Sequence, residues 1–421
     1  MTRRAFCLVA ATLSFELIIA EAPGAPTLED RMRGLLIGSL IGDAAGGPVE
    51  FQDLNQAAAL PGGTKLWREG ERLTDEARAA AARRLTMLPY APLRPEPEPY
   101  AHWRRDAAPG TLTDDSRHKI VLLDGLRRTE AARAWPFTTR SMARAYAVWR
   151  DDCARPHYRE TETLCLEWLA EFGYALAWLE GDRDPARARP PERLWNGLGT
   201  CCGQMTSLPL ALLFPGQADE AYRAAWHIGF FDNGQAKDLN AALVGALAAA
   251  LTVPVDQTPL PAWEKVFAAL LACDPWKHKD IPWCERAADR WLRVARAHVA
   301  AAQGEPARLF RALNQEFAHT VKWEAQVPYT LLVATVLLAE GDPLAAMQLA
   351  IEWGHDTDSD AQMLGAFAGA LFGWQIFPEH VRSPVEARLQ ADYGESVDAW
   401  LTLCDALRAR VAAGQVLFAP E

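Results

Sequence analysis

The chain has 421 residues, of which 50% are apolar and 23% are charged, a composition typical of a soluble globular protein. Its net charge of −11 argues against a nucleic-acid surface, because phosphate binding requires clustered basic side chains. Beyond the N-terminal region, no stretch approaches the roughly 18 uninterrupted apolar residues that a membrane-spanning helix needs.

Residues 1–22 have the pattern of an export signal. Two arginines precede an apolar run that ends at Phe15, and residues 20–22 fit a small-x-small cleavage site. We therefore expect an exported protein, periplasmic or secreted, whose folded domain covers residues 27–421. Glu16 interrupts the apolar character of the segment, and the alternative is a cytoplasmic protein with a loosely ordered apolar N-terminus.

The first helix of the domain carries a glycine at every fourth position, and a helix near the C-terminus repeats the pattern. The two stripes are Gly34, Gly38, Gly42 and Gly46, and Gly365, Gly369 and Gly373. A glycine in a helix costs about 1 kcal/mol relative to alanine. Such stripes are understandable where another helix must approach backbone to backbone. The pattern predicts that both helices are central and closely packed.

Glu50 follows the end of this first helix. Pro48 cannot continue the helix and places Glu50 just beyond its C-terminus, between the apolar residues Val49 and Phe51. A carboxylate on an apolar turn is either an incidental exposed side chain or a general base or metal ligand with a shifted pKa.

The rest of the chain is predicted to be almost entirely helical. Residues 52–70 are expected to form a loop, 71–88 an Arg/Ala-rich helix, and the proline-rich stretch 89–99 an extended surface loop. Further helices are expected at 114–130, 138–152, 160–180, 217–230, 235–252, 260–272, 285–302, 305–317, 326–339, 343–353, 358–373, 383–391 and 395–413. Strand-like alternation is almost absent, so the sequence predicts an all-α protein with one large domain.

Two acidic clusters lie at predicted helix starts far apart in the sequence. One is Thr113-Asp114-Asp115-Ser116, and the other, residues 354–360, contains three aspartates. A helix cap needs only one such side chain, and the repulsion between neighbouring carboxylates is most simply relieved by a bound dication. Hard oxygen ligands select Mg²⁺ or Mn²⁺. The alternative is a pair of solvated acidic turns, but two half-sites on rigid helix starts favour a two-metal site.

Other chemistries find less support. Glu316 and His319 form the only Glu-x-x-His pair beside an apolar helix, and neither a Gly-x-Ser-x-Gly nor a His-Glu-x-x-His motif occurs. The glycine-rich stretch 195–203 leads into a helix expected from Gln204. Its backbone amides could hold a phosphate, although it matches no nucleotide-binding fingerprint. An oxygen-only site favours hydrolysis or sugar and phosphate binding over redox chemistry.

Three motifs in this order resemble those of the ADP-ribosylglycohydrolase family, which includes the dinitrogenase-reductase-activating glycohydrolases. The first is Arg33-Gly-Leu-Leu-Ile-Gly-Ser-Leu-Ile-Gly-Asp43, followed by Pro48-Val-Glu50-Phe51. The second is Leu112-Thr-Asp-Asp-Ser116, where the family has Thr-Asp-Asp-Thr. The third is Gly354-His-Asp-Thr-Asp-Ser359, where the family usually has Gly-Gly-Asp-Thr-Asp-Thr. The resemblance covers roughly residues 28–375.

The resemblance implies an all-α, orthogonal helical bundle with two Mg²⁺ or Mn²⁺ ions in a central cleft, and Glu50 as the catalytic base or acidic gate. The implied metal ligands are Thr113, Asp114, Asp115, Asp356, Asp358 and Ser359. The implied reaction is hydrolysis of a glycosidic bond to ADP-ribose, in an ADP-ribosylated protein or a small ADP-ribosyl substrate. We expect a monomer with no nucleic-acid partner and no membrane span.

Departures from the family pattern lie on the substrate side. His355 replaces a glycine beside the metals, so it either contacts substrate or is an ordinary core or surface histidine. Gly203, Gln204 and Met205 loosely match the family's Asn-Gly-x-x-Met-Arg loop without its arginine, and we expect them to bind substrate. Residues 231–233, Phe-Asp-Asn, stand where a Thr-His pair is expected. Two alternatives therefore stay open: a hydrolase of another ribosyl compound, such as a nucleoside, and a non-catalytic, crystallin-like binding or structural protein.

Overall fold

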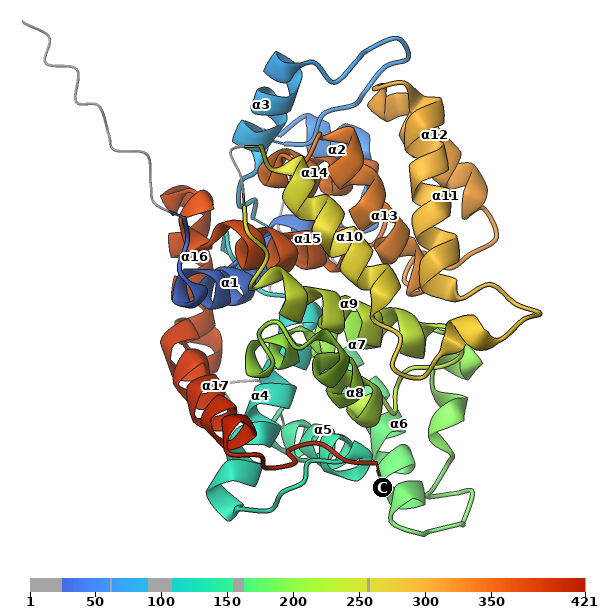
Figure 1. Cartoon of the computed structure of the whole chain (residues 1–421), viewed down its shortest axis with the longest axis vertical. Coiled ribbons are helices and arrows are strands. Elements are labelled where there is room, and N and C mark those ends of the chain that lie inside the picture. The colour runs from blue at the N-terminus through green and yellow to red at the C-terminus, as the bar shows by residue number, and fades with distance from the viewer. Residues whose placement is uncertain (1–24, 61–62, 90–107, 154–162, 256–257, 421) are drawn as a thin grey trace, which may run out of the picture.

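The computed structural model describes residues 25–60, 63–89, 108–153, 163–255 and 258–420 (Figure 1). Within these ranges the regular elements are all helices, accompanied by two isolated β-bridges, which confirms the all-α prediction. No helix in the described part is both long and apolar enough to cross a membrane. The export signal expected over residues 1–22 lies outside the described residues and stays a prediction.

Most helices lie close to the expected ranges. In chain order they are α1 Leu28–Gly46, η1 Gly47–Val49, α2 Leu54–Ala58, α3 Asp75–Arg84, α4 Asp114–Ala132, α5 Thr139–Cys153, α6 Thr163–Leu179, η3 Pro191–Gly197, α7 Cys202–Thr206, η4 Leu208–Leu213, α8 Ala218–Ile228, α9 Ala236–Ala250, α10 Leu260–Ala272, η5 His278–Asp280, α11 Ala287–Ala302, α12 Pro306–Glu316, α13 Gln326–Leu338, α14 Pro343–Trp353, α15 Thr357–Phe372, η6 Trp374–Ile376, α16 Glu379–Tyr393 and α17 Val397–Ala412.

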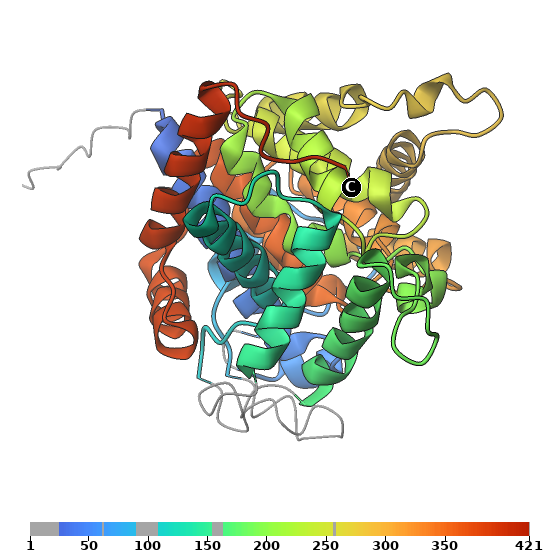
Figure 2. The ribbon, with the colours of Figure 1, turned by 90° about the horizontal axis from the view of Figure 1, so that it is seen from below.

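Helices α1 and α15 lie in the middle of the molecule and are covered on several sides. In Figure 1, α2, α3 and α14 lie above them, and α7, α8 and α9 lie below. The view in Figure 2 shows α16 and α17 along one side of α1, and both contact it. Almost every residue of α1 from Met32 onward and every residue of α15 before Phe372 is buried. The two helices therefore form the core against which the other helices pack.

The glycine stripes lie at the contact between these two central helices. A Cβ at Gly34 would overlap the backbone of Gly369, and a Cβ at Gly38 would overlap the carbonyl oxygen of Gly365. One turn further, Gly42 meets the backbone of Ala361 in the same way. The predicted backbone-to-backbone approach is confirmed. Gly373 lies outside this contact, because it ends α15 as its C-cap with φ +82°.

The sequence prediction was wrong at several helix boundaries. Residues 52–70 contain α2, which begins after Asp53, whose side chain accepts a hydrogen bond from the Asn55 amide. Helix α7 begins at Cys202 rather than Gln204. Helix α16 starts four residues before the expected position and accommodates Pro384 in its interior. Short helices and helix ends depend on tertiary contacts, which local patterns do not report.

Replacing Gly365 by alanine is expected to lower the free energy of unfolding by about 3 kcal/mol or more, because the new Cβ would overlap the carbonyl of Gly38. Guanidinium denaturation measures this quantity. The matched control is Gly173→Ala in α6, where the nearest atom is the flexible end of Arg150. The control should be neutral or stabilising by up to about 1 kcal/mol. Equal stabilities for the two variants would contradict the packing argument.

Candidate metal centre and substrate cavity

Two helix starts and one helix end bring the acidic residues together. Helix α4 begins at Asp114 with Thr113 as its N-cap, and α15 has Asp356 as its N-cap. The Asp356 side chain makes no capping hydrogen bond, so capping does not account for its carboxylate. Glu50 is the C-cap residue of η1, directly after α1. Three segments from distant parts of the chain therefore meet at one place.

The carboxylates form two groups that share one member. Ligand atoms of Glu50, Asp356 and Asp358 lie within 4.8 Å of one another, and so do those of Asp114, Asp115 and Asp358. Because Asp358 belongs to both groups, the five side chains make one continuous cluster. Carboxylate oxygens at such separations can share divalent ions.

Burial and mutual repulsion make this cluster electrostatically unfavourable by itself. Burial raises the pKa of Asp115, Asp356 and Asp358 well above the usual range, and neighbouring carboxylates raise each pKa further. Asp115 Oδ1 and Asp358 Oδ2 are among the buried side-chain atoms that have no hydrogen-bond partner in the described part of the chain. Buried polar atoms normally have partners. Unpartnered hard oxygens in a negatively charged cluster fit divalent cations such as Mg²⁺ or Mn²⁺.

The two hydroxyls expected as metal ligands hold the cluster in place. Thr113 Oγ1 donates to Asp43 Oδ1 at 2.6 Å and accepts from the Asp115 amide at 3.2 Å. Ser359 Oγ donates to Asp115 Oδ2 at 3.3 Å, and the Ser359 amide donates to Asp358 Oδ1 at 3.0 Å. The Ser359 hydroxyl thus joins the start of α15 to the start of α4.

Two charged residues behind the cluster were missed by the sequence analysis. Asp43, buried in α1, accepts hydrogen bonds from Thr113 and from the hydroxyl of Ser116. Lys119 donates to the carbonyl of Asp115 at 3.0 Å and to the side chain of Gln362. Burial raises the pKa of Asp43 and lowers that of Lys119, and each opposes the shift of the other. A lone aspartate among the glycines and apolar residues of α1 was the available signal.

A cavity of about 220 Å³ lies against the acidic cluster. Its lining residues are Glu50, Phe51, Asp114, Asp115, His118, Trp195, Thr200, Cys201, Cys202, Met205, Trp323, Asp356 and Ser359. The Cys201 sulfur lies 3.7 Å from Asp356 Oδ2 and 3.6 Å from Ser359 Oγ. Burial raises the pKa of the Cys201 thiol well above its usual range, so the thiol is neutral. The wall thus combines carboxylates with aromatic and sulfur-containing side chains.

Of the four residues expected to bind substrate, Met205 lines the cavity and the other three do not. His355 packs edge-on against Trp353, and its Nε2 lies 2.9 Å from Asn314 Oδ1. The Gly203 amide donates to Asp232 at 3.1 Å, and a Cβ at Gly203 would lie 2.5 Å from the same carboxylate.

Gln204 is fully buried, and its side-chain amide donates to the Ala325 carbonyl at 2.9 Å. Gly203 and Gln204 therefore support the cavity wall from behind. The loop that the motif identified contributes Met205 to the cavity lining. Which of its residues line the cavity depends on the packing of α7 against its neighbours.

His118 is a lining residue that sequence analysis missed. It lies on α4, one turn after Asp114 and Asp115, and its Nδ1 lies 2.6 Å from the Tyr146 hydroxyl. Burial, with the positive charges of Lys119 and Arg117, lowers its pKa to about 3, so the imidazole is neutral. The helical spacing from the two aspartates was the signal that could have identified it.

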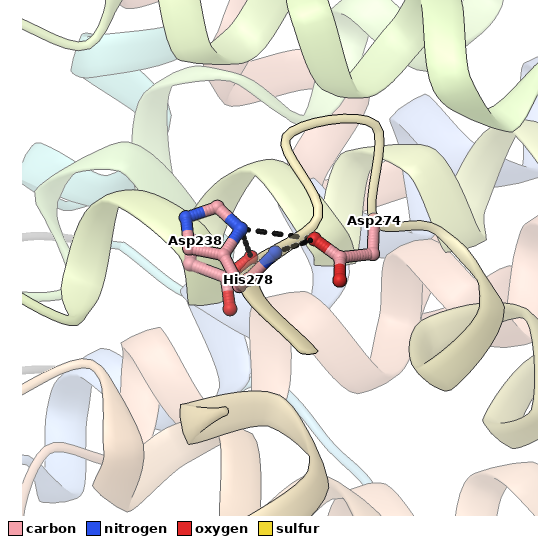
Figure 3. A group of neighbouring side chains, drawn as sticks. All are labelled: Asp238, Asp274 and His278. Carbon is pink, nitrogen blue, oxygen red and sulfur yellow. Dashed lines mark hydrogen bonds and ion pairs between the residues drawn. The ribbon is translucent and has the colours of Figure 1, made fainter. Parts of the chain in front are cut away.

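A second group of potential metal ligands lies apart from this cavity, and its carboxylates are paired with positively charged or hydrogen-bonding partners. Asp238, Asp274 and His278 lie close together, as Figure 3 shows. Arg286 donates to both carboxylate oxygens of Asp238 at 2.7 and 2.8 Å, and the Tyr222 hydroxyl donates to the same carboxylate. Asp274 accepts from the amide of His278 at 2.9 Å. These ligands are already paired, so the group is an ion-pair clamp at the base of the segment 273–286.

The fold and the site define an all-α protein whose buried carboxylates, gathered beside a cavity, can bind metal ions. The model of the ADP-ribosylglycohydrolase family matches residues 24–415, and the chain belongs to this family.

A solved structure described as an ADP-ribosylglycohydrolase-related protein complex is similar at 17% identity. The match covers 91% of this chain and 98% of that one, with a TM-score of 0.48. A comparison with curated proteins finds no match.

Asp358→Asn is expected to stabilise the protein in EDTA at pH 8 by roughly 1–2 kcal/mol, because it removes one repelling charge from the buried cluster. Thermal unfolding at fixed pH measures the change. The matched control is Asp75→Asn, at an exposed aspartate in the first turn of α3 whose side chain is 89% accessible. A variant less stable than the wild type in EDTA would show that Asp358 makes a net favourable interaction instead.

Asp232 is expected to make stability depend on pH. Burial raises its pKa to about 7, although Lys237, Asn240 and the Gly203 amide oppose the shift. The unfolded chain releases this proton near pH 4, whereas the folded protein retains it to about pH 7. The free energy of unfolding therefore falls as pH rises through this window, by roughly 4 kcal/mol from this group, and levels off above it.

Denaturant unfolding of wild type and Asp232→Asn from pH 4 to pH 8 tests this expectation. The difference between the two proteins isolates Asp232 from the other buried carboxylates. It should grow in favour of the variant as pH rises. Parallel profiles would contradict the raised pKa.

Proposed function

We propose that the protein is a Mg²⁺- or Mn²⁺-dependent hydrolase that cleaves a glycosidic bond to ADP-ribose, in an ADP-ribosylated protein or a small ADP-ribosyl compound. The observation that carries the proposal is the meeting of two acidic helix starts with Glu50 beside one cavity, with buried carboxylate oxygens that have no partner in the described part of the chain. Membership of a family of mostly metal-dependent hydrolases supports it.

The proposed ligands approach two ions from opposite sides. Thr113, Asp114 and Asp115 would hold them from the start of α4, and Asp356, Asp358 and Ser359 from the start of α15. Bound ions would polarise the ribose hydroxyls and a water molecule. The carboxylates would set the position of the sugar, because Thr113 at the start of α4 is hydrogen-bonded to Asp43, and Ser359 at the start of α15 is hydrogen-bonded to Asp115.

Glu50 is the proposed general base. It lines the cavity, its side chain is partly buried, and its carboxylate belongs to the same group as Asp356 and Asp358. A carboxylate there can accept a proton from the attacking water as positive character develops at the anomeric carbon.

Two other functions are compatible with the same fold. A hydrolase of another ribosyl compound, such as a nucleoside, would use the same acids with a different substrate wall. A non-catalytic, crystallin-like protein would have no need of buried, mutually repelling carboxylates, which are costly to maintain. Because these acids are all present beside the cavity, an enzyme is favoured.

The decisive assay is release of free ADP-ribose from arginine- and serine-ADP-ribosylated peptides, with Mg²⁺, with Mn²⁺ and with EDTA. The wild type should release ADP-ribose only with metal, and Asp356→Asn should reduce the rate by roughly a thousandfold or more. Glu50→Gln should reduce turnover while retaining metal-induced thermal stabilisation, since it removes the base.

The control for this assay is again Asp75→Asn, which should keep full activity. Metal-induced stabilisation without ADP-ribose release would move the substrate to another ribosyl compound. Thermal stability that ignores Mg²⁺, Mn²⁺ and EDTA alike would contradict the metal site.

A further inference from the structure

A series of buried hydrogen bonds links His118 in the cavity lining to α7 through Tyr146 on α5. His118 Nδ1 lies 2.6 Å from the Tyr146 hydroxyl, which lies 3.1 Å from Thr206 Oγ1. Thr206 Oγ1 in turn lies 2.8 Å from the carbonyl oxygen of Cys202. All four residues are buried, and the proposed reaction uses none of their side chains. The direction of these bonds decides what His118 can do in the cavity.

Each of the three contacts needs one proton, and only one arrangement supplies all three. A carbonyl oxygen can only accept, so the Thr206 hydroxyl donates to Cys202. Thr206 Oγ1 must then accept from Tyr146, and the Tyr146 oxygen must accept from His118 Nδ1. Burial raises the pKa of the Tyr146 hydroxyl well above its usual range, so the phenol keeps the proton that this arrangement requires. Nδ1 of His118 therefore carries a proton.

The second ring nitrogen of His118 carries no proton. Burial, together with the positive charges of Lys119 and Arg117, lowers the pKa of His118 to about 3, so the ring is neutral. A neutral imidazole has a single N–H group, and its proton on Nδ1 leaves Nε2 as a hydrogen-bond acceptor. The Cys202 sulfur lies 4.0 Å from Nδ1, but a thiol is a much weaker partner than a phenol and does not change this assignment.

Tyr146 is held in position by aromatic side chains. Its ring packs against Phe172 with centroids 4.5 Å apart, and against Phe230 and Phe231 with centroids 6.0 Å apart. Tyr146 is also one of the largest fully buried side chains among the described residues. Because a close-packed ring cannot turn without displacing its neighbours, the Tyr146 hydroxyl is a fixed acceptor for the Nδ1 proton.

The chemistry of the lining limits what His118 can bind. The described lining contains neither lysine nor arginine, and its ionisable side chains other than His118 are carboxyl and thiol groups. Because Nδ1 is engaged with Tyr146, Nε2 is the nitrogen through which His118 can bind a group in the cavity. A nitrogen lone pair attracts a hydroxyl or an N–H group and repels the oxygens of a phosphate or a carboxylate.

We propose that His118 is a specificity-determining residue, whose Nε2 accepts a hydrogen bond from a neutral donor, such as a sugar hydroxyl, of the ligand in this cavity. Tyr146 is the positioning residue that fixes the tautomer of His118. It is not among the described lining residues, so it acts only through His118. This inference rests on the proposed function for the presence of a sugar in the cavity, and it adds a contact that the acidic helix starts do not provide.

The tautomer is measured first, because it does not depend on any ligand. ¹⁵N spectra of protein labelled in its histidine side chains distinguish protonated from unprotonated ring nitrogens. The chain has nine histidines, and the signals absent from His118→Gln identify those of His118. At pH 7 its Nδ1 should be protonated and its Nε2 unprotonated, whereas the exposed His319 should populate both tautomers. The opposite tautomer at His118, or an imidazolium, would overturn the inference.

Two substitutions of His118 separate the roles of its nitrogens. Glutamine places an amide oxygen near the position of Nε2, whereas asparagine places its amide near Nδ1, within reach of Tyr146. ADP-ribose and adenosine are titrated calorimetrically into each protein in Mg²⁺ buffer. His118→Gln should bind nearly as well as the wild type, and His118→Asn should bind roughly tenfold more weakly, as expected for one lost hydrogen bond. Equal affinities of the two variants, or binding of neither probe to the wild type, would overturn the inference.

Tyr146→Phe tests the positioning role. It removes the acceptor of the Nδ1 proton, so the tautomer protonated at Nε2 should become populated and binding should weaken by roughly tenfold. The matched control is Tyr329→Phe, at another fully buried tyrosine, whose hydroxyl donates to the Ala288 carbonyl at 3.1 Å and which is not among the lining residues. The control should leave the tautomer and the binding unchanged. An unchanged tautomer in Tyr146→Phe would reject the role of Tyr146.

The two proposals fail in different ways. Metal-dependent release of ADP-ribose with an unchanged KM in His118→Asn would reject the role of His118 and retain the hydrolase. A difference between His118→Gln and His118→Asn in adenosine binding, without metal-dependent turnover of any ribosyl compound, would reject the hydrolase and retain the role of His118.

Discussion

The direct backbone contact between α1 and α15 is the constraint on which the rest of the structure depends. Because Gly34, Gly38 and Gly365 leave no side chains between the helices, the axes approach more closely than ordinary packing allows. The contact continues to the end of α1, where the Thr357 hydroxyl donates to the Gly46 carbonyl at 2.8 Å. The loop that begins after α1 and the start of α15 are therefore held side by side, and Glu50 and Asp356 with them.

The packing of the core offsets the electrostatic repulsion within the acidic cluster. The carboxylates at the start of α4 and α15 repel one another in a buried setting, and burial raises the pKa of each of the three deepest. Apolar packing around the central helices and hydrogen bonds to Asp43 oppose this repulsion. Lys119 places a positive charge on the side of the acidic cluster away from the cavity. On the side facing the cavity, divalent ions would neutralise the remaining carboxylate charge.

The cavity is lined by two kinds of residues, which come from different parts of the fold. Asp114, Asp115, Asp356 and Ser359 are fixed by helix starts, and Glu50 follows a helix end. The aromatic lining residues Phe51, Trp195 and Trp323 come from loops and a short helix. A rigid acidic wall combined with loop residues elsewhere in the lining is an arrangement in which one fold can accept different ligands. In this chain the lining residues besides the acids include Cys201, Cys202 and Met205 together with aromatic side chains.

The sequence by itself determined the class of fold, the central glycine-striped helices and the two acidic helix starts, because these features follow from local periodicity and helix-end chemistry. It also placed Glu50 at the end of the first helix. Only the tertiary structure decided that His118 and Trp323 line the cavity and that Gly203, Gln204 and His355 do not. The reason is physical: helix periodicity is a local property, whereas the direction of a side chain in a short helix or loop depends on neighbours distant in sequence.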